Sequence, residues 1–287
     1  MGVEQTVMFC IGAAKAGTSW LSNYLYFHPE TGLRAMKEIH YWDCLENRVG
    51  AFWRKQHQGR VDYLSERRTR ETIVAAQQFQ DASLGDLGEW LDTFDGKTRD
   101  DAAYLKFLGQ GGDAKLIGDI TPSYAILSED MFRAMANVAA KVKFVFILRD
   151  PVERLWSHLR MDAAGDATKL AAGLDGFLNN DGAHDHVRRS NYRRTIQRLM
   201  NVIPRDALHV EYYERLFMPE AIARLSAFLG ITPQPADFAR QINQSASADL
   251  PVDNRIQLQA QLWPQYNFVG KFMGELPREW TERMVHA

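Results

Sequence analysis

Short apolar runs that end in a glycine or a polar residue dominate the hydrophobic pattern of the chain. Residues 6–12 (TVMFCIG), 114–119 (AKLIGD) and 141–148 (KVKFVFIL) have the length and side chains of buried strands. The pattern also predicts a strand at 33–37 (LRAMK) and another within 207–216 (ALHVEYYERL). Segments with helical spacing separate these runs, so the pattern indicates an α/β fold with a central, mostly parallel sheet.

Helical segments begin and end at clear signals. Apolar residues at helical spacing predict a helix at 18–27, and Asp150, Pro151 and Glu153 form a helix start that places Ser157 in the second turn. Helices are also expected at 190–204 and 219–230, the latter stopped by Gly230. The stretches 50–79 and 98–110 predict helices inside a long helical insertion, residues 45–114. Most aromatic residues of this insertion are expected to pack in a core or lid: Trp53, Tyr63, Phe79, Trp90, Phe94 and Tyr104.

Composition narrows the class of protein. No linker or repeat divides the 287 residues, so we expect one domain over 1–287. A net charge of −2 gives no general attraction to nucleic acid, and the basic stretch 188–198 (RRSNYRRTIQR) is interpreted as a solvated helix face. The two cysteines, Cys10 and Cys44, have no metal-ligand spacing, and Cys10 is expected to be a buried thiol. With neither a signal peptide nor a transmembrane segment in its pattern, the chain is expected to be cytoplasmic.

The segment that follows the first strand has the spacing of a phosphate-binding loop. In GAAKAGTS (12–19), Gly12 and Gly17 are spaced as in the Walker sequence, but Thr18 stands where that sequence has lysine, and Lys15 lies inside the loop. The N-terminus of the following helix still favours an anion. Magnesium-dependent chemistry on a nucleoside triphosphate is disfavoured. In the Walker sequence the hydroxyl residue that holds magnesium directly follows the lysine, whereas Ala16 follows Lys15 here. A P-loop kinase or NTPase stays open as the alternative.

Several polar residues are expected at one edge of the sheet. A helix over 18–27 descends about 15 Å, and a strand of about five residues climbs back ~16 Å. Lys37 and Glu38 should therefore return to the level of Lys15, while Asp119 and Arg149 end their own strands. Ligands of open α/β sheets bind at this edge.

These residues together resemble the sulfotransferases that use 3′-phosphoadenosine 5′-phosphosulfate (PAPS). GAAKAGTSWL is similar to their 5′-phosphosulfate loop, and FILRDPVERLWSHL (146–159) to their 3′-phosphate motif. KEIHYWD (37–43), GDITPSYA (118–125) and residues 192–216 resemble segments of the heparan sulfate-type branch, in the same order. The resemblance covers about residues 5–230 and implies a P-loop-like three-layer α/β/α sandwich.

The resemblance also implies an activity of the EC 2.8.2 type with residue roles. The expected donor is PAPS, the expected nucleotide product is adenosine 3′,5′-bisphosphate (PAP), and no metal is expected. The residues expected to bind the cofactor are Lys15, Ala16, Gly17, Thr18, Ser19, Trp20, Arg149 and Ser157. Glu38 is the expected general base and His40 its rival; Lys15 is expected to stabilise the departing phosphate. Lys37 would orient Glu38 or contact the sulfate. The partner is expected to be a carbohydrate, lipid headgroup or small metabolite that offers a hydroxyl or amine, and not a nucleic acid.

Departures from the family pattern leave alternatives open. Ile120 stands where many relatives of the heparan sulfate-type branch have lysine, and no cysteine follows Cys44 to form their C-terminal disulfide loop. Ile120 is the support for a non-enzymatic nucleotide-binding protein as a third interpretation. Gly270-Lys271 matches the lysine-glycine cofactor loop of the family only loosely. The alternative is that these two residues belong to a plain surface loop. Asp43 and Asp119 are expected either to bind acceptor hydroxyls or to make structural hydrogen bonds.

Overall fold

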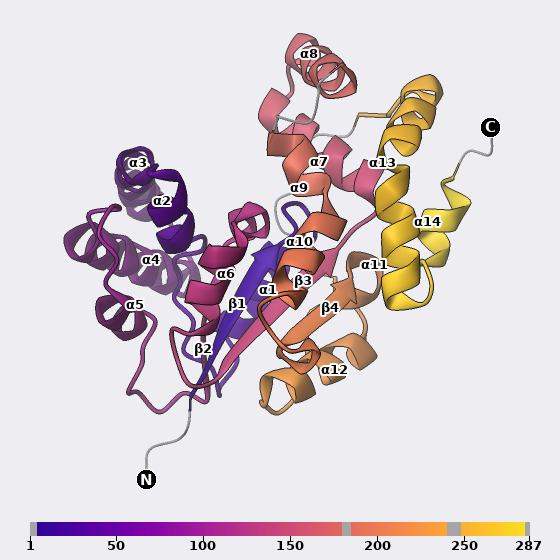
Figure 1. Cartoon of the computed structure of the whole chain (residues 1–287). Helices are drawn as coiled ribbons and strands as arrows, with labels where there is room; N and C mark the ends of the chain where they lie inside the picture. Colours follow the sequence, from indigo (N-terminus) through magenta and orange to yellow (C-terminus); the bar gives the residue numbers. More distant parts are fainter. Residues whose placement is uncertain (1–4, 180–184, 240–247, 285–287) are drawn as a thin grey trace.

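Four parallel strands form the centre of the computed structural model, which describes residues 5–179, 185–239 and 248–284 (Figure 1). They are β1 (Thr6–Gly12), β2 (Leu116–Ile120), β3 (Val142–Leu148) and β4 (Leu208–Tyr212). Their order across the sheet is β2-β1-β3-β4, with parallel pairing throughout. The predicted α/β fold and four of its predicted strands are confirmed.

The strand predicted at 33–37 is wrong. Thr31 forms an isolated parallel bridge with Leu116, and no strand follows it. The carboxylate of Asp86, on helix α4 (Val74–Thr93), accepts hydrogen bonds from the Met36 N–H at 3.0 Å and from Arg34 Nη1 at 2.9 Å. Because a side chain takes the Met36 donor, this N–H is not available to a β-ladder.

The strand order places a topological switch point beside β1, where open α/β sheets have their ligand crevice. From β1 the chain crosses to β2 on one side, and the later strands β3 and β4 lie on the other side. The loops that follow β1 and β3 therefore diverge from adjacent strands at the carboxyl edge of the sheet. Ligands of open α/β sheets bind at such a switch point. The segments 12–18 and 149–150 both lie there.

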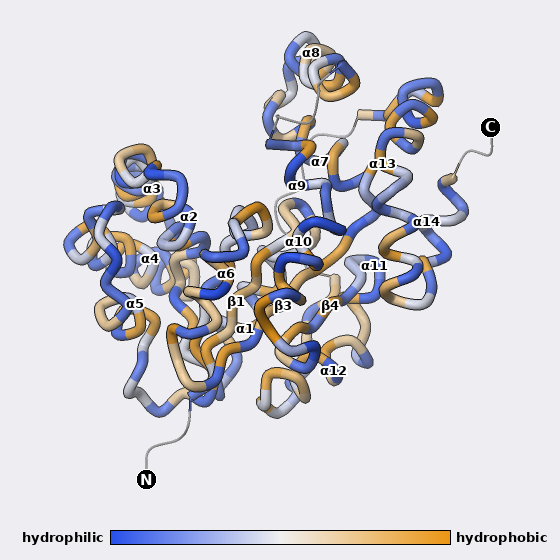
Figure 2. The backbone as a smooth tube through the Cα atoms, in the orientation of Figure 1, coloured by the Kyte–Doolittle hydropathy of each residue, from blue (hydrophilic) through white to orange (hydrophobic). Residues whose placement is uncertain are grey.

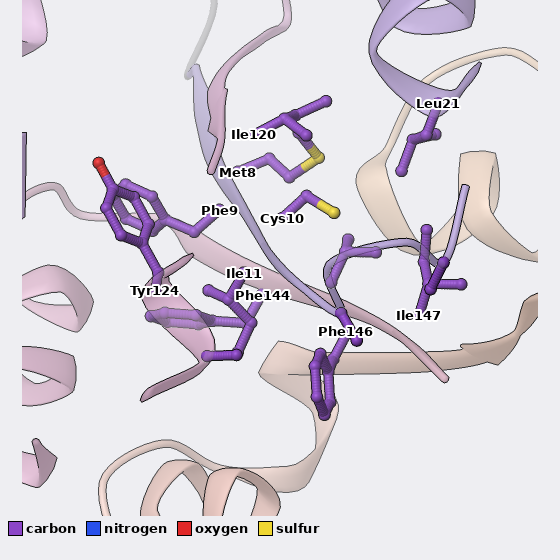
Figure 3. Close-up of a cluster of buried hydrophobic side chains, with 14 of the residues drawn as sticks. Met8, Phe9, Cys10, Ile11, Leu21, Ile120, Tyr124, Phe144, Phe146 and Ile147 are labelled. Carbon is purple, nitrogen blue, oxygen red and sulfur yellow. The ribbon is translucent and has the colours of Figure 1, made fainter. Parts of the chain in front are cut away.

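The core lies along the sheet. All residues of β1 and β2 are buried, since each of these strands is covered on both faces. Figure 3 shows Phe9, Ile11 and Phe144 on one side of β1 with Tyr124, while Cys10 and Leu21 lie on the other. Cys10 is fully buried, as predicted, and burial raises the pKa of its thiol to about 12.

The predicted insertion is helical. It contains the last three residues of α2 (Tyr41–Asn47) and all of α3 (Gly50–Arg70), α4 and α5 (Asp101–Phe107), and these helices gather on the β2 side of the sheet in Figure 1. The helix expected over 50–79 breaks at 71–73, where the Glu71 carboxylate accepts from the N–H groups of Thr72 and Ile73. Trp90, Phe94 and Tyr104 belong to the buried core as predicted, whereas Tyr63 is exposed.

The other helices flank the sheet or cover its far edge. They are α1 (Thr18–Tyr26), η1 (Pro122–Ile126), α6 (Glu129–Ala136), α7 (Pro151–Ala163), α8 (Ala167–Leu178), α9 (Asp185–Ser190), α10 (Tyr192–Met200), η2 (Arg205–Ala207), α11 (Tyr213–Leu216), α12 (Pro219–Leu229), α13 (Val252–Met273) and α14 (Arg278–Glu282). In Figure 2 hydrophobic segments gather at the strands, while hydrophilic residues dominate α10. No helix in the described part of the chain is long and apolar enough to cross a membrane.

Candidate active site

The loop between β1 and α1 has the backbone of an anion-binding site. Gly17 is the N-cap residue of α1 with φ 82°, and a Cβ there would lie 3.1 Å from Leu216 and 3.2 Å from Tyr213. Glycine is therefore needed both for the conformation and for the space. No side chain caps the N-terminus of α1. Its first N–H groups remain directed at the crevice, where a phosphate would accept from them.

Lys15 lies inside this loop at the meeting point of β1 and β3. Its carbonyl oxygen accepts a hydrogen bond of 2.8 Å from Arg149 Nη1, and its Nζ lies 3.4 Å from the sulfur of Met161 on α7. Burial lowers the pKa of the Lys15 ammonium, and the positive charges of Arg149 and Lys37 lower it further. The structure thus brings Lys15 and Arg149 together, as the sequence predicts. An anion bound among these cations would relieve their mutual repulsion.

Lys37 completes the same site although the strand expected to carry it is absent. Its Nζ donates to Ser19 Oγ at 2.9 Å, to Thr18 Oγ1 at 3.3 Å and to Glu38 Oε1 at 3.1 Å. It therefore links the first turn of α1 to the carboxylate of Glu38. The segment 32–40 returns to the level of the loop, as the β-α-β geometry requires, by an irregular path.

Glu38 and His40 occupy left-handed backbone conformations, with φ 63° and 55°. For residues with a Cβ this conformation costs roughly 1–2 kcal/mol each. Trp90 Nε1 donates a 2.8 Å hydrogen bond to the carbonyl oxygen of Ile39 between them, and the ring of Trp53 stacks on that of His40. Contacts from α3 and α4 therefore hold the turn that presents the carboxylate.

The imidazole of His40 lies between two carboxylates. Its Nδ1 is 2.7 Å from Asp43 Oδ2, and its Nε2 is 3.5 Å from Glu38 Oε2. Burial alone would lower the pKa of His40, but the hydrogen bonds and charges of Asp43 and Glu38 raise it overall. Burial would raise the pKa of Glu38, but His40 and Lys37 hold it well below its usual range. The site therefore favours an imidazolium beside an ionised glutamate.

Asp43 and Asp119 serve the structure of the site. Asp43 Oδ2 also accepts from Ser123 Oγ at 2.7 Å, which ties α2 to η1. Asp119 is fully buried and accepts hydrogen bonds from the hydroxyls of Thr121, Tyr124 and Tyr104 at 2.6, 2.7 and 2.8 Å. The sequence leaves two roles open for Asp119. These contacts support the structural one, because all three of its hydrogen-bond donors are buried side chains of the protein itself.

Arg149 lies at the carboxyl end of β3, beside the loop. Its guanidinium is 4.8 Å from the ring centroid of Tyr213, and its carbonyl oxygen accepts from the Tyr192 hydroxyl at 2.7 Å. Asp150 caps α7 as predicted, since its carboxylate accepts from the N–H groups of Val152 and Glu153. Ser157 lies on the buried face of α7, in its second turn.

Two expected cofactor residues lack a side chain that faces the crevice. Ala16 is fully buried. The indole of Trp20 donates to the carbonyl oxygen of Asp237 at 2.9 Å and packs against Tyr24 and Phe217. The side chain of Trp20 thus belongs to the packing of α1, and the residue can reach an anion only through its backbone N–H.

Sequence analysis missed two residues of the crevice. Arg60 on α3 donates to the carbonyl oxygen of Lys37 at 3.0 Å, and burial lowers the pKa of its guanidinium while the charge of Glu38 opposes this. Met161 is the neighbour of Lys15 described above. Neither lies in a motif: Arg60 belongs to the insertion, and Met161 follows the motif of residues 146–159. Gly270-Lys271, which has a loose motif, lies within α13 and not in a loop.

A group with metal-ligand chemistry lies on α7 and α9. The ligand atoms of His158, Asp162 and His186 lie within 4.8 Å of one another. However, Arg154 Nη1 is 3.3 Å from His158 Nδ1, and a guanidinium can only donate. The neutral His158 ring then keeps its proton on Nε2, which faces Asp162 at 3.9 Å. This arrangement leaves His158 without a lone pair for a metal ion.

Comparisons with known proteins define the class. The profile of the sulfotransferase family matches residues 8–235, so the chain belongs to the sulfotransferase family, and the resemblance seen in the motifs is confirmed. The chain is similar in fold to a sulfotransferase from Alicyclobacillus acidocaldarius, with TM-score 0.62 and 19% identity over 96% of this chain and 98% of the other. It is also similar to the sulfotransferase domain of the Synechococcus PCC 7002 olefin synthase, with TM-score 0.53 and 17% identity over 96% and 98%. No curated protein matches the sequence.

Proposed function

We propose that this protein transfers a sulfuryl group from PAPS to a hydroxyl or amine of its acceptor. The observation that carries the proposal is the convergence of three features on one spot. Lys15, Lys37 and the uncapped N-terminus of α1 provide positive charge there, and Glu38 adjoins them through its 3.1 Å contact with Lys37. A sulfuryl group in flight needs fixed positive charge along the line of transfer and a base at the acceptor end.

The donor half holds the nucleotide by its two phosphates. The N–H groups at the start of α1 and the hydroxyls of Thr18 and Ser19 would bind the 5′-phosphate. Arg149 offers a planar fork for the 3′-phosphate, with Ser157 as a further donor. In the transfer step the bond from sulfur to the phosphate oxygen breaks, and Lys15 stabilises the charge that develops on that oxygen.

The acceptor half supplies the base. As the acceptor oxygen bonds to sulfur, its proton passes to the carboxylate of Glu38, a contribution that is typically ~10²–10⁴-fold. Lys37 and His40 hold Glu38 ionised at neutral pH. His40 is the weaker candidate because Asp43 and Glu38 flank both of its ring nitrogens and stabilise its protonated form, which has no lone pair.

The insertion completes this half of the site. We propose that residues 45–114 form part of the same domain and cover the acceptor side of the crevice. Trp53 and Arg60, both on α3, contact His40 and Lys37 directly. The chemistry of the acceptor beyond its nucleophile then depends on the side chains around this half of the crevice.

A transfer assay tests the proposal. The protein is incubated with PAPS, a metal chelator and a panel of hydroxyl and amine compounds, and sulfated products are identified by mass spectrometry. We expect a sulfated product together with PAP. A parallel incubation with ATP and magnesium serves as the control for the kinase alternative. A phosphorylated product there, with none from PAPS, would overturn the proposal.

A further inference from the structure

An arginine pocket lies outside the residues used so far. Arg188 on α9 and Arg194 and Arg198 on α10 line a shallow pocket whose floor includes Ala125 and Ile126 of η1. These arginines belong to the basic stretch 188–198, for which sequence analysis predicts a solvated helix face. The structure instead turns part of that face, which Figure 2 colours as hydrophilic, toward η1. We call Arg188, Arg194 and Arg198 the arginine pocket.

The positive charges of this pocket are only partly compensated. Burial lowers the pKa of Arg198, and the neighbouring charges of Arg194 and Arg188 lower it further, against the opposing charges of Glu46 and Glu129. Glu46 already accepts from Ser128 N at 2.9 Å, and Glu129 is paired with Arg133 at 3.3 Å. The carboxylates nearest to Arg198 are therefore engaged elsewhere.

The three guanidinium groups differ in the hydrogen bonds and ion pairs that they form. Arg198 Nη1 donates to the carbonyl oxygen of Leu127 at 2.6 Å, so this side chain also caps η1. Arg188 pairs with Asp185 on the surface at 3.2 Å. Within the described residues, the guanidinium of Arg194 forms no hydrogen bond or ion pair, and Arg194 lies one helical turn from Arg198 on the same face of α10. Two like charges at this spacing destabilise a helix unless an anion lies between them.

The pocket shares the turn η1 with the residues that support His40. Its floor residues Ala125 and Ile126 belong to the same 3₁₀ turn as Ser123, which binds Asp43 beside His40. The rise from Ser123 to Ile126 is only ~6 Å at about 2 Å per residue of such a turn. The turn follows β2, which lies across β1 from β3, the strand that carries Arg149. The pocket is thus linked through η1 to the residues that support the base, and through Tyr192, the first residue of α10, to the carbonyl oxygen of Arg149.

We propose that the arginine pocket binds an anionic oxygen group of the acceptor, a carboxylate, sulfate or phosphate that is separate from the hydroxyl or amine to be sulfated. The inference rests on the proposed function and adds to it the class of acceptor. Arginine forks match the geometry of such oxyanions and bind them in pairs of hydrogen bonds. The pocket then selects anionic acceptors and orients them from a point beyond the reacting atom.

Binding of inorganic phosphate to the PAP-saturated protein tests this proposal. PAP affinity is measured first, by calorimetry, and phosphate is then titrated at constant ionic strength. The variant Arg194→Gln removes a guanidinium that holds no other described group, so it should fold normally. Arg193→Gln is the matched control, since Arg193 is the preceding residue of the same helix, is exposed and does not line the pocket. We expect Arg194→Gln to weaken the binding of phosphate by roughly tenfold or more, which is the scale of a hydrogen bond to a charged group.

The outcomes separate this inference from the proposed function. Failure of PAP to bind the wild-type protein would count against the proposed function itself. PAP binding without phosphate binding, or with phosphate binding that Arg194→Gln leaves intact, would overturn the arginine pocket. A loss of PAP affinity in Arg194→Gln would assign the pocket to the donor and likewise overturn it. Among acceptors found in the transfer assay, anionic compounds should predominate and should show a raised KM with Arg194→Gln; a set of neutral acceptors with unchanged KM would contradict the proposal.

Discussion

The proposed donor side and the proposed acceptor side of the crevice place their polar groups by different means. On the donor side, Lys15 and Arg149 follow directly from β1 and β3, and regular helices begin within a few residues of each. On the acceptor side, Glu38 and His40 sit in an irregular segment that is held by Trp53 and Trp90 from the insertion. The donor side is thus determined by strand-helix junctions, and the acceptor side by packing between distant segments.

This difference has a consequence for mutation. A strand-helix junction keeps its geometry as long as the sheet forms, so substitutions on the acceptor side should leave the donor side intact. The acceptor side depends on residues far apart in sequence, such as Trp90 and Ile39, and can be remodelled through the insertion. Changes on the two sides should therefore have separable effects on nucleotide affinity and on turnover.

The largest separable effect is expected from the base. Glu38→Gln should lower turnover by ~10²–10⁴-fold, because the amide cannot accept the acceptor proton. PAP affinity should remain within about twofold of the wild-type value, since no donor phosphate is assigned to Glu38. Turnover is measured as PAP release from PAPS with an acceptor from the transfer assay. Glu66→Gln, on the exposed surface of α3, is the control. Normal turnover in Glu38→Gln would remove Glu38 from the mechanism.

The next effect concerns the opposite side of the crevice. Arg149→Ala should weaken the binding of PAP by roughly 2–4 kcal/mol, which is the scale for removing one partner of a buried charge pair. Adenosine 5′-phosphate, which lacks the 3′-phosphate, should lose little affinity, so calorimetry with both nucleotides separates a direct contact from a disturbed loop. This control is needed because Arg149 also donates to the carbonyl oxygen of Lys15. Equal losses for both nucleotides would contradict the assignment of Arg149 to the 3′-phosphate.

A third effect tests the packing that carries the acceptor side. Asp119→Asn replaces an acceptor of three hydroxyl donors and should lower the free energy of unfolding by about 1–3 kcal/mol, as measured by urea denaturation. Burial raises the pKa of Asp119 from 3.8 to about 6, against the opposing hydrogen bonds. The folded state then binds the proton more tightly than the unfolded state. This contribution is fully present below about pH 4 and is lost as pH rises through about 6.

The same substitution therefore gives a pH signature. The difference in stability between wild type and Asp119→Asn should narrow as pH rises from about 4 to about 7. Asp162→Asn is the control, because Asp162 has a half-exposed side chain and lies outside the core. A difference that widens with rising pH would show that the carboxylate, not the carboxylic acid, is the form that the fold prefers.

The smallest effect distinguishes the two candidate bases. The pKa of Glu38 is held below its ordinary value of 4.5, whereas that of His40 is raised above 6.5. With Glu38 as base, turnover should change by less than about twofold between pH 5.5 and pH 7, because the carboxylate is already ionised throughout. With His40 as base, turnover would fall nearly tenfold per pH unit below its pKa. The measurement is the pH dependence of kcat at saturating PAPS and acceptor.

Sequence reasoning reached the donor side because its signals are local. The apolar run of β1, the spacing of Gly12 and Gly17, and the cap formed by Asp150 are all contiguous in the chain. It also placed Glu38 at the correct edge of the sheet, although the strand that it used for this was wrong. Glu38 lies at that edge because Lys37, which contacts its carboxylate, also binds Ser19 in the first turn of α1.

The acceptor side could not be predicted in the same way. The stacking of Trp53 on His40 and the hydrogen bond from Arg60 to Lys37 join residues whose spacing follows no period. The basic stretch that holds Arg194 has the pattern of a surface helix, and only the position of η1 turns part of it into a pocket. Such contacts depend on tertiary packing, which local propensity does not encode.

The most direct test of the account is calorimetric titration of the wild-type protein with PAP and with ADP in the absence of metal. The account predicts tight binding of PAP and weak binding of ADP, because Arg149 and Ser157 are assigned to a 3′-phosphate that ADP lacks. Binding of ADP with equal affinity, or binding of either nucleotide only with magnesium, would contradict the assignment of Lys15 and Arg149 to a sulfonucleotide donor.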